Sequence, residues 1–484
     1  MGLTMAFVGG TVYYDWYKKK VLDKIEQAFE GGYDPALELV VHSKLQGTDR
    51  QLPEAIDELD IEEGPWTEHL RRREQDILDK IIHGIETGHY FMLLGSKGAG
   101  KTTMVLDAMQ RNQAEGVAMC DAHPDLEVFR LRMGKALNYE FNEDTQTGLF
   151  QRRDPREGNF STPHPLPILN KLEKVALRRN KKTGKPLVLV INNVHYFKND
   201  ESGQSMLMQL QQRAEAWAAS GAFSLVYKSR VQDDFWPFIV LRKHASRMST
   251  LTIYDLAPDE AASACRDIRR FTRLPTPPMS VIEKATSIVG GRLSYLNRVA
   301  RSRDMVEIAR HMLSVEKGWL LSQIGLIDDC DDDVMDEQKW SSCSWLLLKE
   351  FVKVREEQER ETAAQIEAGE LPSDAMKRLP LPAIPYHMCR QIMTRADFLE
   401  ELDRLNVISI DIHHDVRPDS MLILEAARAV VNEEGFDELL ESVRNRINDI
   451  ESLHRTRELT FKDLPEDNRI YLTIVKGGSP ERRV

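Results

Sequence analysis

The feature that most constrains the fold of this chain is the run GSKGAGKT at residues 95–102. It fits the pattern GxxxxGK[ST] at every position, which chance would produce in a chain of this composition roughly once in a hundred times. The apolar residues 90–94 predict a strand that leads into the run, and residues 103–112 predict a helix after it. A strand, a glycine-rich loop and a helix in this order form a phosphate-binding loop, or P-loop, so the run predicts an α/β protein with a nucleotide site.

Each residue type in the P-loop has a chemical task. The glycines let backbone N–H groups approach phosphate oxygens, and the start of the next helix directs its positive end at the anion. Lys101 is expected to reach the β- and γ-phosphates, and the Thr102 hydroxyl is expected to face Mg²⁺. Because no guanine-reading motif such as NKxD occurs, the expected cofactors are ATP and Mg²⁺. The predicted nucleotide-binding residues are Gly95, Ser96, Lys97, Gly98, Ala99, Gly100, Lys101, Thr102 and Thr103.

Further short apolar runs alternate with helical patterns after the P-loop. Strands are predicted at residues 117–120, 187–191, 223–227 and 251–254, with helices at 126–137, 169–179 and 207–219 between them. Residues 187–191 are five consecutive aliphatic residues, which is typical of a strand buried on both faces. This alternation predicts a three-layer α/β/α fold around a parallel sheet.

The strand at residues 187–191 ends in two amides where a P-loop enzyme needs acids. At this position, called Walker B, one carboxylate holds Mg²⁺ through water, and many enzymes need a second carboxylate to orient the attacking water. Asn192 can still accept a hydrogen bond from a metal-bound water, which makes Asn192 and Thr102 the predicted metal ligands, but Asn193 cannot act as a general base. We expect firm ATP binding with slow or absent hydrolysis. The alternative is that Asp200 or Glu201 supplies the carboxylate and the chain is an active ATPase.

The order of these features resembles that of AAA+ ATPases, in the branch shared by origin-recognition ATPases, archaeal ATPases and the signalling STAND NTPases. The resemblance covers about residues 65–310, and only the P-loop within it is motif-specific. Within this group the chain is similar to fungal ATPases and, more distantly, to the fungal mitochondrial escape protein, whose ATPase domain is tethered to the inner membrane. The resemblance implies a P-loop core, a helical lid and nucleotide-dependent activity.

The resemblance also implies roles for residues outside the P-loop. Ser229 occupies the sensor-1 slot and is implied to touch the γ-phosphate or the attacking water. Arg247 resembles an arginine finger, which acts on the nucleotide of a neighbouring subunit in a homo-oligomer. Arg292, after Gly290 and Gly291, resembles the sensor-2 arginine, which reaches the γ-phosphate and couples the lid to the nucleotide state. Residues 71–74 resemble an Arg–Glu element near the base, and residues 192–195 a DDxH motif whose acids are replaced. The implied catalytic residues are Lys101, Asn193, Ser229, Arg247 and Arg292.

The second half of the chain changes character. Residues from Pro258 to about 324 are helical in pattern, and seven carboxylates fall within residues 328–337, which predicts a solvated linker. Residues 341–435 suggest a winged helix, with residues 394–405 as the candidate recognition helix and a hairpin of strands 407–412 and 421–424 as the wing. That helix carries two Arg against four acids, which favours a structural clamp or a contact with a protein partner of unknown identity over DNA. The predicted domains begin with an N-terminal segment (1–64), the P-loop core (65–256) and the lid (257–325). The acidic linker (326–340), the winged-helix-like domain (341–435) and a C-terminal helix with a tail (436–484) follow.

Both ends of the chain carry apolar patterns with two interpretations each. Residues 2–14 are apolar and precede Trp16, Tyr17 and three lysines, which is typical either of a segment packed on the body or of a membrane-proximal segment over residues 2–17. Thirteen residues of helix rise only about 20 Å, less than a bilayer core. Near the other end, apolar residues between 436 and 450 follow a 4-3-4-3 spacing, which predicts docking on the body or, alternatively, formation of an oligomer.

Composition narrows the class of protein. The net charge of −12 argues against a general nucleic-acid coat protein. The five scattered cysteines form no CxxC pair, so we expect reduced thiols in an intracellular protein; mitochondrial membrane association is the alternative that the resemblance and the N-terminal pattern raise. We therefore expect an ATP-binding switch or scaffold, and keep as alternatives an active AAA+ ATPase that remodels a protein or nucleic acid, and a DNA-binding ATPase of the origin-recognition kind.

Overall fold

The computed structural model describes residues 2–34, 71–139, 166–229, 236–272, 274–456, 473–474 and 482–483. Its central element is a five-stranded parallel sheet with the strand order β2-β3-β4-β1-β5. The strands are β1 (Tyr90–Gly95), β2 (Val117–Asp121), β3 (Leu187–Asn192), β4 (Phe223–Lys228) and β5 (Met248–Ile253). The parallel sheet predicted from the alternation is confirmed. Only β5 begins earlier than predicted, because polar residues at its start pair in register with β1.

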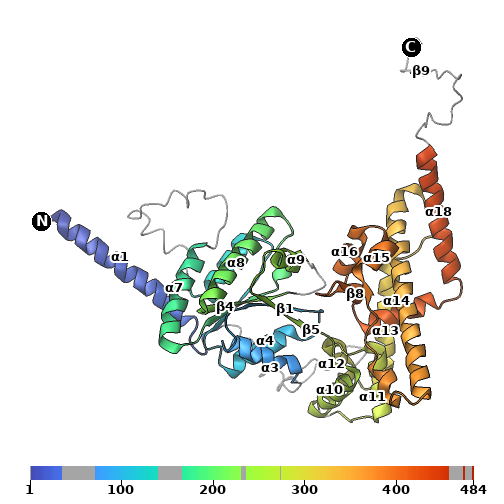
Figure 1. Cartoon of the computed structure of the whole chain (residues 1–484), viewed down its shortest axis with the longest axis horizontal. Coiled ribbons are helices and arrows are strands. Elements are labelled where there is room, and N and C mark those ends of the chain that lie inside the picture. Colours follow the sequence, from blue (N-terminus) through green and yellow to red (C-terminus); the bar gives the residue numbers. More distant parts are fainter. Residues whose placement is uncertain are drawn as a thin grey trace, which may run out of the picture.

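The helices cover both faces of the sheet, as Figure 1 shows. On one face lie α3 (Arg73–Ile82) and α4 (Lys101–Arg111), and on the other lie α5 (Leu126–Ala136), α7 (Leu166–Thr183), α8 (Glu201–Ser220) and the unpredicted α9 (Trp236–Lys243). Alternate side chains of β1 serve the two faces: Phe91 and Leu93 pack with α3 and α4, while Met92 and Leu94 join the opposite cluster. The three-layer α/β/α prediction is confirmed.

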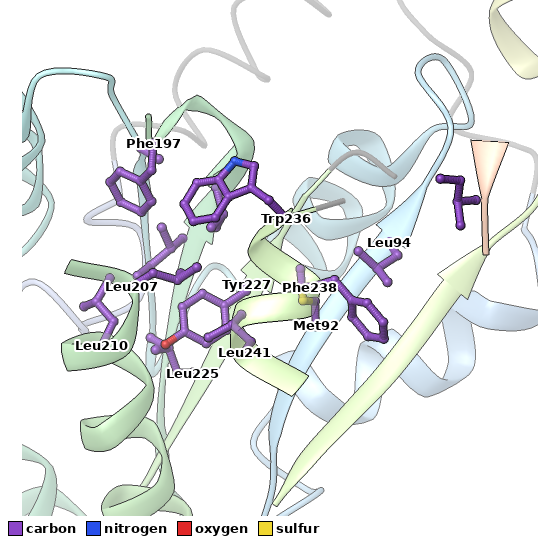
Figure 2. Close-up of a cluster of buried hydrophobic side chains, with 14 of the residues drawn as sticks. Met92, Leu94, Phe197, Leu207, Leu210, Leu225, Tyr227, Trp236, Phe238 and Leu241 are labelled. Atoms are coloured by element: carbon purple, nitrogen blue, oxygen red, sulfur yellow. The ribbon is translucent and has the colours of Figure 1, made fainter. Parts of the chain in front are cut away.

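Aromatic and aliphatic side chains fill the space between the sheet and helices α8 and α9. Figure 2 shows Met92 and Tyr227 from the strands facing Leu207, Leu210 and Leu241 from these two helices. All five side chains are buried. This packing holds the carboxyl ends of β1 and β4 in fixed positions, and these ends carry the functional residues described below.

A helical lid follows the sheet, as the sequence predicted. It consists of α10 (Pro258–Phe271), α11 (Met279–Val289), α12 (Leu293–Arg301) and α13 (Met305–Gln323). The apolar core of the lid also includes Leu422 from the next domain. The lid and that domain therefore share buried surface.

The C-terminal domain has the predicted winged-helix architecture. It contains α14 (Met335–Glu367), α15 (Tyr386–Met393), α16 (Ala396–Arg404), α17 (Met421–Val431) and a three-stranded sheet of β6 (Ile384–Pro385), β8 (Asp415–Pro418) and β7 (Ile408–Ile410). The prediction of a strand at residues 421–424 is wrong, because Ser420 accepts a hydrogen bond from Ile423 N (3.3 Å) and caps the start of α17. The return strand is β8 instead. The Asp411 carboxylate closes the turn before it by accepting hydrogen bonds from the backbone N–H groups of His413 and Asp415.

The apolar stripe near the C-terminus docks on the body of the protein. It lies on α18 (Phe436–Thr456), and its five apolar residues are all buried: Phe436, Leu440, Val443, Ile447 and Ile450. Three of them enclose Cys330, which comes from the acidic segment that was predicted to be a solvated linker. That segment forms the short helix η3 (Asp332–Val334), and Arg446 Nε donates to Cys330 O (3.0 Å). The docking prediction for the stripe is confirmed. The seven carboxylates of the acidic segment are exposed, as predicted for a solvated linker, and the segment is also anchored through Cys330.

The first helix, α1 (Gly2–Gln27), is packed on the body at one end only. Val21 and Ile25 are buried beside α7, and Arg178 Nη1 donates to Asp23 Oδ1 at 2.6 Å. Farther toward the N-terminus Val12 is 64% exposed, and Figure 1 shows α1 projecting away from the sheet. Among the helices that the structure describes, none is long and apolar enough to cross a membrane. The membrane-proximal interpretation stays a prediction.

The remaining elements are short. They are the 3-10 turns η2 (Val194–Tyr196) and η4 (Ser373–Arg378), and an antiparallel pair formed by β9 (Thr473–Ile474) and β10 (Arg482–Arg483). All five cysteines are free thiols, which agrees with the predicted absence of disulfides. Within the described residues, no cluster of His, Cys, Asp and Glu is arranged to hold a metal ion.

Candidate nucleotide site

The P-loop lies between β1 and α4 and has the conformation that the motif requires. Gly98 and Gly100 have φ values of +81° and +94°, in the left-handed region that glycine tolerates best. No side chain among the described residues caps the start of α4, so its first N–H groups are open to an anion. A Cβ atom at Gly95 would lie 2.4 Å from Ile253 O of the neighbouring strand. The backbone can therefore form a phosphate cradle only with glycine at these positions.

Lys101 lies inside this loop. Its side chain is buried, and Nζ donates to the carbonyl oxygens of Gly95 (2.5 Å) and Ser96 (2.6 Å). The lysine charge is thus already held at the start of α4, where a phosphate would bind. Thr102 is half-buried beside it, whereas the predicted binding residues Lys97 and Thr103 have exposed side chains.

Arg72, from the Arg–Glu element, donates hydrogen bonds to the backbone of the P-loop and of the segment after β5. Its guanidinium donates to Ala99 O (2.9 Å) and to Tyr254 O (2.5 Å), so it ties the P-loop to the end of β5. Arg72 is buried, and Glu74 contacts its Nε atom at 3.4 Å. In this structure the element holds the backbone of the phosphate cradle.

The Walker B position forms a hydrogen-bond chain that includes a lysine. Asn192 Nδ2 donates to Asp121 Oδ1 at 2.6 Å, and Asn192 Oδ1 accepts from Lys228 Nζ at 2.5 Å. The same ammonium group also donates to Thr102 Oγ1. The two predicted metal ligands, Thr102 and Asn192, are therefore brought together, but an ammonium group lies between them. In this arrangement they do not fit Mg²⁺, because a second cation would face the lysine charge.

Sequence reasoning missed Lys228 and chose its neighbour. Ser229 is buried, and its backbone N–H donates to Leu93 O at 3.0 Å, which continues the ladder from β4 to β1. The signal that could have found Lys228 is a charged residue directly after the apolar strand predicted at residues 223–227. Only the observed strand order places that strand between the P-loop strand and the Walker B strand.

The alternative source of a catalytic carboxylate is not supported. Asp200 caps α8 by accepting hydrogen bonds from Gly203 N (2.7 Å) and Ser202 Oγ (2.7 Å), and these bonds lower the pKa of its carboxyl group. Glu201 is exposed in the first turn of the same helix. Asn193 has a φ of 57°, a left-handed conformation in which asparagine is among the favoured residues. His195 follows, buried in the turn η2.

Arg292, the predicted sensor-2 residue, is only 2% exposed and is bound to two carboxylates. Nε and Nη2 lie 3.3 Å from the two oxygens of Asp255, Nη1 donates to the Asp419 carboxylate, and Nη2 donates to Asp419 O at 2.5 Å. Burial alone would lower the pKa of the guanidinium, but Asp255 and Asp419 outweigh burial and raise that pKa well above its ordinary value. Arg292 therefore stays charged and joins the core, the lid and the winged-helix domain.

Close backbone contacts accompany this junction. Ser294 N donates to Gly98 O at 3.2 Å, so the first turn of α12 rests on the P-loop. A Cβ atom at Gly290 would lie 2.5 Å from Met421 Cβ, and one at Gly291 would lie 1.9 Å from Leu256 O. The two glycines let the lid approach both the winged-helix domain and the sheet.

Arg247 lies away from this group of residues. It is exposed and directly precedes β5. The first residue of β5 pairs with the first residue of β1, whereas the P-loop begins at the last residue of β1. A six-residue strand is about 20 Å long, so Arg247 and the P-loop of the same chain lie at opposite ends of the strands. Its backbone N–H donates to Glu215 Oε1 at 3.1 Å. A role on a neighbouring subunit stays a prediction.

Comparison with known families agrees with this geometry. The family described as AAA ATPase domain matches residues 70–225, and the family described as fungal AAA protein, C-terminal winged helix domain, matches residues 321–451. A comparison with curated proteins gives no match.

A comparison with solved structures gives matches that include the following three. The Walker-type ATPase of Pyrococcus abyssi is 12% identical with a TM-score of 0.44, and the match covers 74% of this chain and 96% of that one. The ORC2 protein of Aeropyrum pernix in its ADP form is 14% identical with a TM-score of 0.33, covering 84% and 97%. AMPPCP-bound DnaA from Aquifex aeolicus is 10% identical with a TM-score of 0.32, covering 77% and 92%.

The P-loop between β1 and α4, the sheet order and the two matched domains lead to one assignment. The chain contains an AAA ATPase domain and a C-terminal winged helix domain of the kind found in fungal AAA proteins.

Proposed function

We propose that this protein is a nucleotide-dependent switch or scaffold of the STAND kind, which binds ATP and hydrolyses it weakly or not at all. The observation that carries the proposal is the position of Arg292, bound by Asp255 and by Asp419 of the winged-helix domain. The buried Arg292 guanidinium thus connects the lid of the nucleotide site to the winged-helix domain, which would signal whether nucleotide is bound.

The phosphates would be bound by the backbone of the P-loop and by Lys101. The left-handed glycines and the uncapped start of α4 fit an anion, and the Lys101 ammonium needs only to exchange two carbonyl partners for phosphate oxygens. Phosphate oxygens carry negative charge, so the Lys101 ammonium gains an ion-pair attraction that the neutral carbonyl oxygens do not offer, which favours this exchange.

Signalling would follow from competition for Arg292. A γ-phosphate brings new negative charge to the P-loop, on which the first turn of α12 rests through Ser294. Arg292 cannot keep its contacts with Asp419 and also turn toward a phosphate. If Arg292 turns, the Asp419 carboxylate loses its buried partner, and an unpaired buried carboxylate is costly. The winged-helix domain would then shift away from the lid and present a new surface to a protein partner.

Weak hydrolysis follows from the Walker B amides. Asn192 cannot carry the negative charge that holds a metal-bound water, and Asn193 cannot accept a proton from the attacking water. Asp200, the nearest acid in the sequence after them, is committed to capping α8. The acidic character of α16, with Arg395 paired to Asp397, supports a protein partner rather than DNA.

The test combines nucleotide affinity with phosphate release. The wild-type chain is titrated with ATP and ADP, and steady-state phosphate release is measured with Lys101→Ala as the blank. We expect saturable ATP binding and a phosphate-release rate close to the blank. Turnover near ~1 per second, in the ordinary range for P-loop enzymes, would instead support an active AAA+ ATPase. Absence of binding to either nucleotide would overturn the proposal.

A further inference from the structure

Lys228 lies at the end of the strand between the P-loop strand and the Walker B strand. The strand order places β4 between β1, which leads into the P-loop, and β3, which ends at Asn192. Because the strands are parallel, the carboxyl end of β4 meets the carboxyl ends of both neighbours. Lys228 is the last residue of β4, and its side chain reaches both Thr102 and Asn192.

The contacts of the ammonium group are those of a bridging cation. Nζ donates to Thr102 Oγ1 and to Asn192 Oδ1, and Lys228 is only 4% exposed. In P-loop enzymes the threonine hydroxyl is a direct Mg²⁺ ligand and the Walker B carboxylate holds the same ion. The lysine therefore joins the same two positions that a metal ion would otherwise join.

Asp121 fixes the orientation of the amide in this bridge. Asn192 Nδ2 donates to Asp121 Oδ1 at 2.6 Å, so the amide oxygen must face the lysine. The pair lies in register, with Asp121 opposite Asn192 on adjacent strands. An aspartate at position 192 would instead place two carboxylates side by side, which disfavours the charged form of both. The asparagine thus suits a lysine partner and an aspartate neighbour together.

We propose that this chain binds nucleotide as the metal-free anion, with the Lys228 ammonium in the place of Mg²⁺ beside the β- and γ-phosphates. The inference rests on the proposed function only in that a nucleotide occupies the P-loop. Mg²⁺ binds oxygen ligands at about 2.0–2.1 Å with near-octahedral geometry, whereas an ammonium group offers only N–H donors and repels a second cation. With Lys101 on the other side, two lysine charges face the phosphates.

A lysine in the place of Mg²⁺ accounts for the absence of acids at the Walker B position. A carboxylate at position 192 serves to hold a divalent ion, and a site that uses a fixed lysine has no such ion to hold. The substitution of Asn192 and the presence of Lys228 are then two parts of one change. It also gives a physical reason for slow hydrolysis, since neither a metal ion nor a general base is present to act on water.

The decisive measurement is ATP affinity of the full-length wild-type chain, measured by calorimetry with excess EDTA and again with excess Mg²⁺. We expect the two dissociation constants to agree within about threefold, less than the tenfold that corresponds to 1.4 kcal/mol. Binding only in the presence of Mg²⁺ would overturn the role of Lys228 and leave the proposed switch intact. Binding in neither condition would overturn the proposed function itself, so the two failures are distinguishable.

Two variants test the role of the Lys228 ammonium in nucleotide binding. In EDTA, Lys228→Met should weaken ATP binding at least about tenfold, whereas the exposed-lysine control Lys198→Met should not. The double variant Asn192→Asp with Lys228→Ser restores a carboxylate and removes the cation, so its ATP affinity should rise about tenfold or more when Mg²⁺ replaces EDTA. Unchanged binding by Lys228→Met in EDTA, with a native circular dichroism spectrum, would contradict the proposal.

Discussion

Replacing Asp419 by Asn tests the contact between the lid and the winged-helix domain. Asp419 is buried, and both its carboxylate and its backbone carbonyl accept hydrogen bonds from Arg292. Removing one partner of a buried ion pair costs about 3–5 kcal/mol. Here Asn keeps the shape and the backbone contact, and Asp255 still pairs with Arg292 at 3.3 Å. We therefore expect the free energy of unfolding to fall by about 2 kcal/mol, near the value of a charged hydrogen bond.

The same substitution should raise ATP affinity. In our account Arg292 must leave Asp419 when it turns toward the γ-phosphate, so a weaker contact with position 419 makes that movement less costly. If most of the ~2 kcal/mol is recovered on binding, the dissociation constant for ATP should fall about tenfold or more. ADP lacks the γ-phosphate, so its dissociation constant should change much less. Stability is measured by urea unfolding, and affinity by calorimetry.

A matched control separates the switch contact from general loosening of the domain. Glu359→Gln breaks a pair within the winged-helix domain, in which Arg428 Nη2 contacts Glu359 Oε2 at 2.5 Å. This variant should lose stability, by about 1 kcal/mol for a partly exposed pair, without a change in ATP affinity. The reasoning is refuted if Asp419→Asn binds ATP more weakly than wild type, or if Glu359→Gln gains as much ATP affinity as Asp419→Asn.

Three further predictions concern other parts of the chain. Lys101→Ala should weaken ATP binding by at least about tenfold in calorimetry, because the variant lacks the P-loop ammonium; retained affinity would argue against the site. Gly290→Ala should lower the melting temperature more than Gly221→Ala, since both glycines have positive φ but only at Gly290 would a Cβ atom meet Met421, at 2.5 Å; equal losses would show that the close approach is unimportant. Burial raises the thiol pKa of Cys265 and Cys389 to about 12, so both should resist alkylation up to about pH 9 in the native chain and react after unfolding restores an ordinary thiol pKa near 8.5. Rapid labelling of either residue in native protein, detected by peptide mass spectrometry, would contradict their burial.

The parts of the fold that could be predicted are those in which the pattern is local. The P-loop motif, the aliphatic run of β3 and the alternation of strands and helices each depend on a few neighbouring residues, and the sheet follows from them. The helix α9 escaped prediction because its eight residues are too short to show a period. The prediction for β5 omitted its first three residues because two of them, Ser249 and Thr250, are polar. The wing was misplaced because the apolar start of α17 fits a strand as well as a helix.

The parts of the site that could not be predicted depend on contacts between distant residues. Arg292 was identified by position, but its partner Asp419 is 127 residues farther along the chain, in another domain. Asn192 suggested a weakened metal site, but its contact with Lys228, 36 residues farther along the chain, depends on the strand order. In both cases the meaning of a side chain is set by the strand order and the domain packing, which bring together residues that the sequence keeps apart.

Amide hydrogen exchange of the wild-type chain can show whether bound nucleotide controls the junction between the lid and the winged-helix domain. The segment to follow is α17 (Met421–Val431), which begins at Met421, the residue closest to Gly290, two residues after Asp419. If nucleotide state controls the junction through Arg292, saturating ATP should increase exchange at the start of α17 relative to the ADP-bound and nucleotide-free chain, while exchange in α18 stays unchanged. Identical exchange of α17 in all three states, under conditions in which ATP binding is demonstrated, would contradict the account.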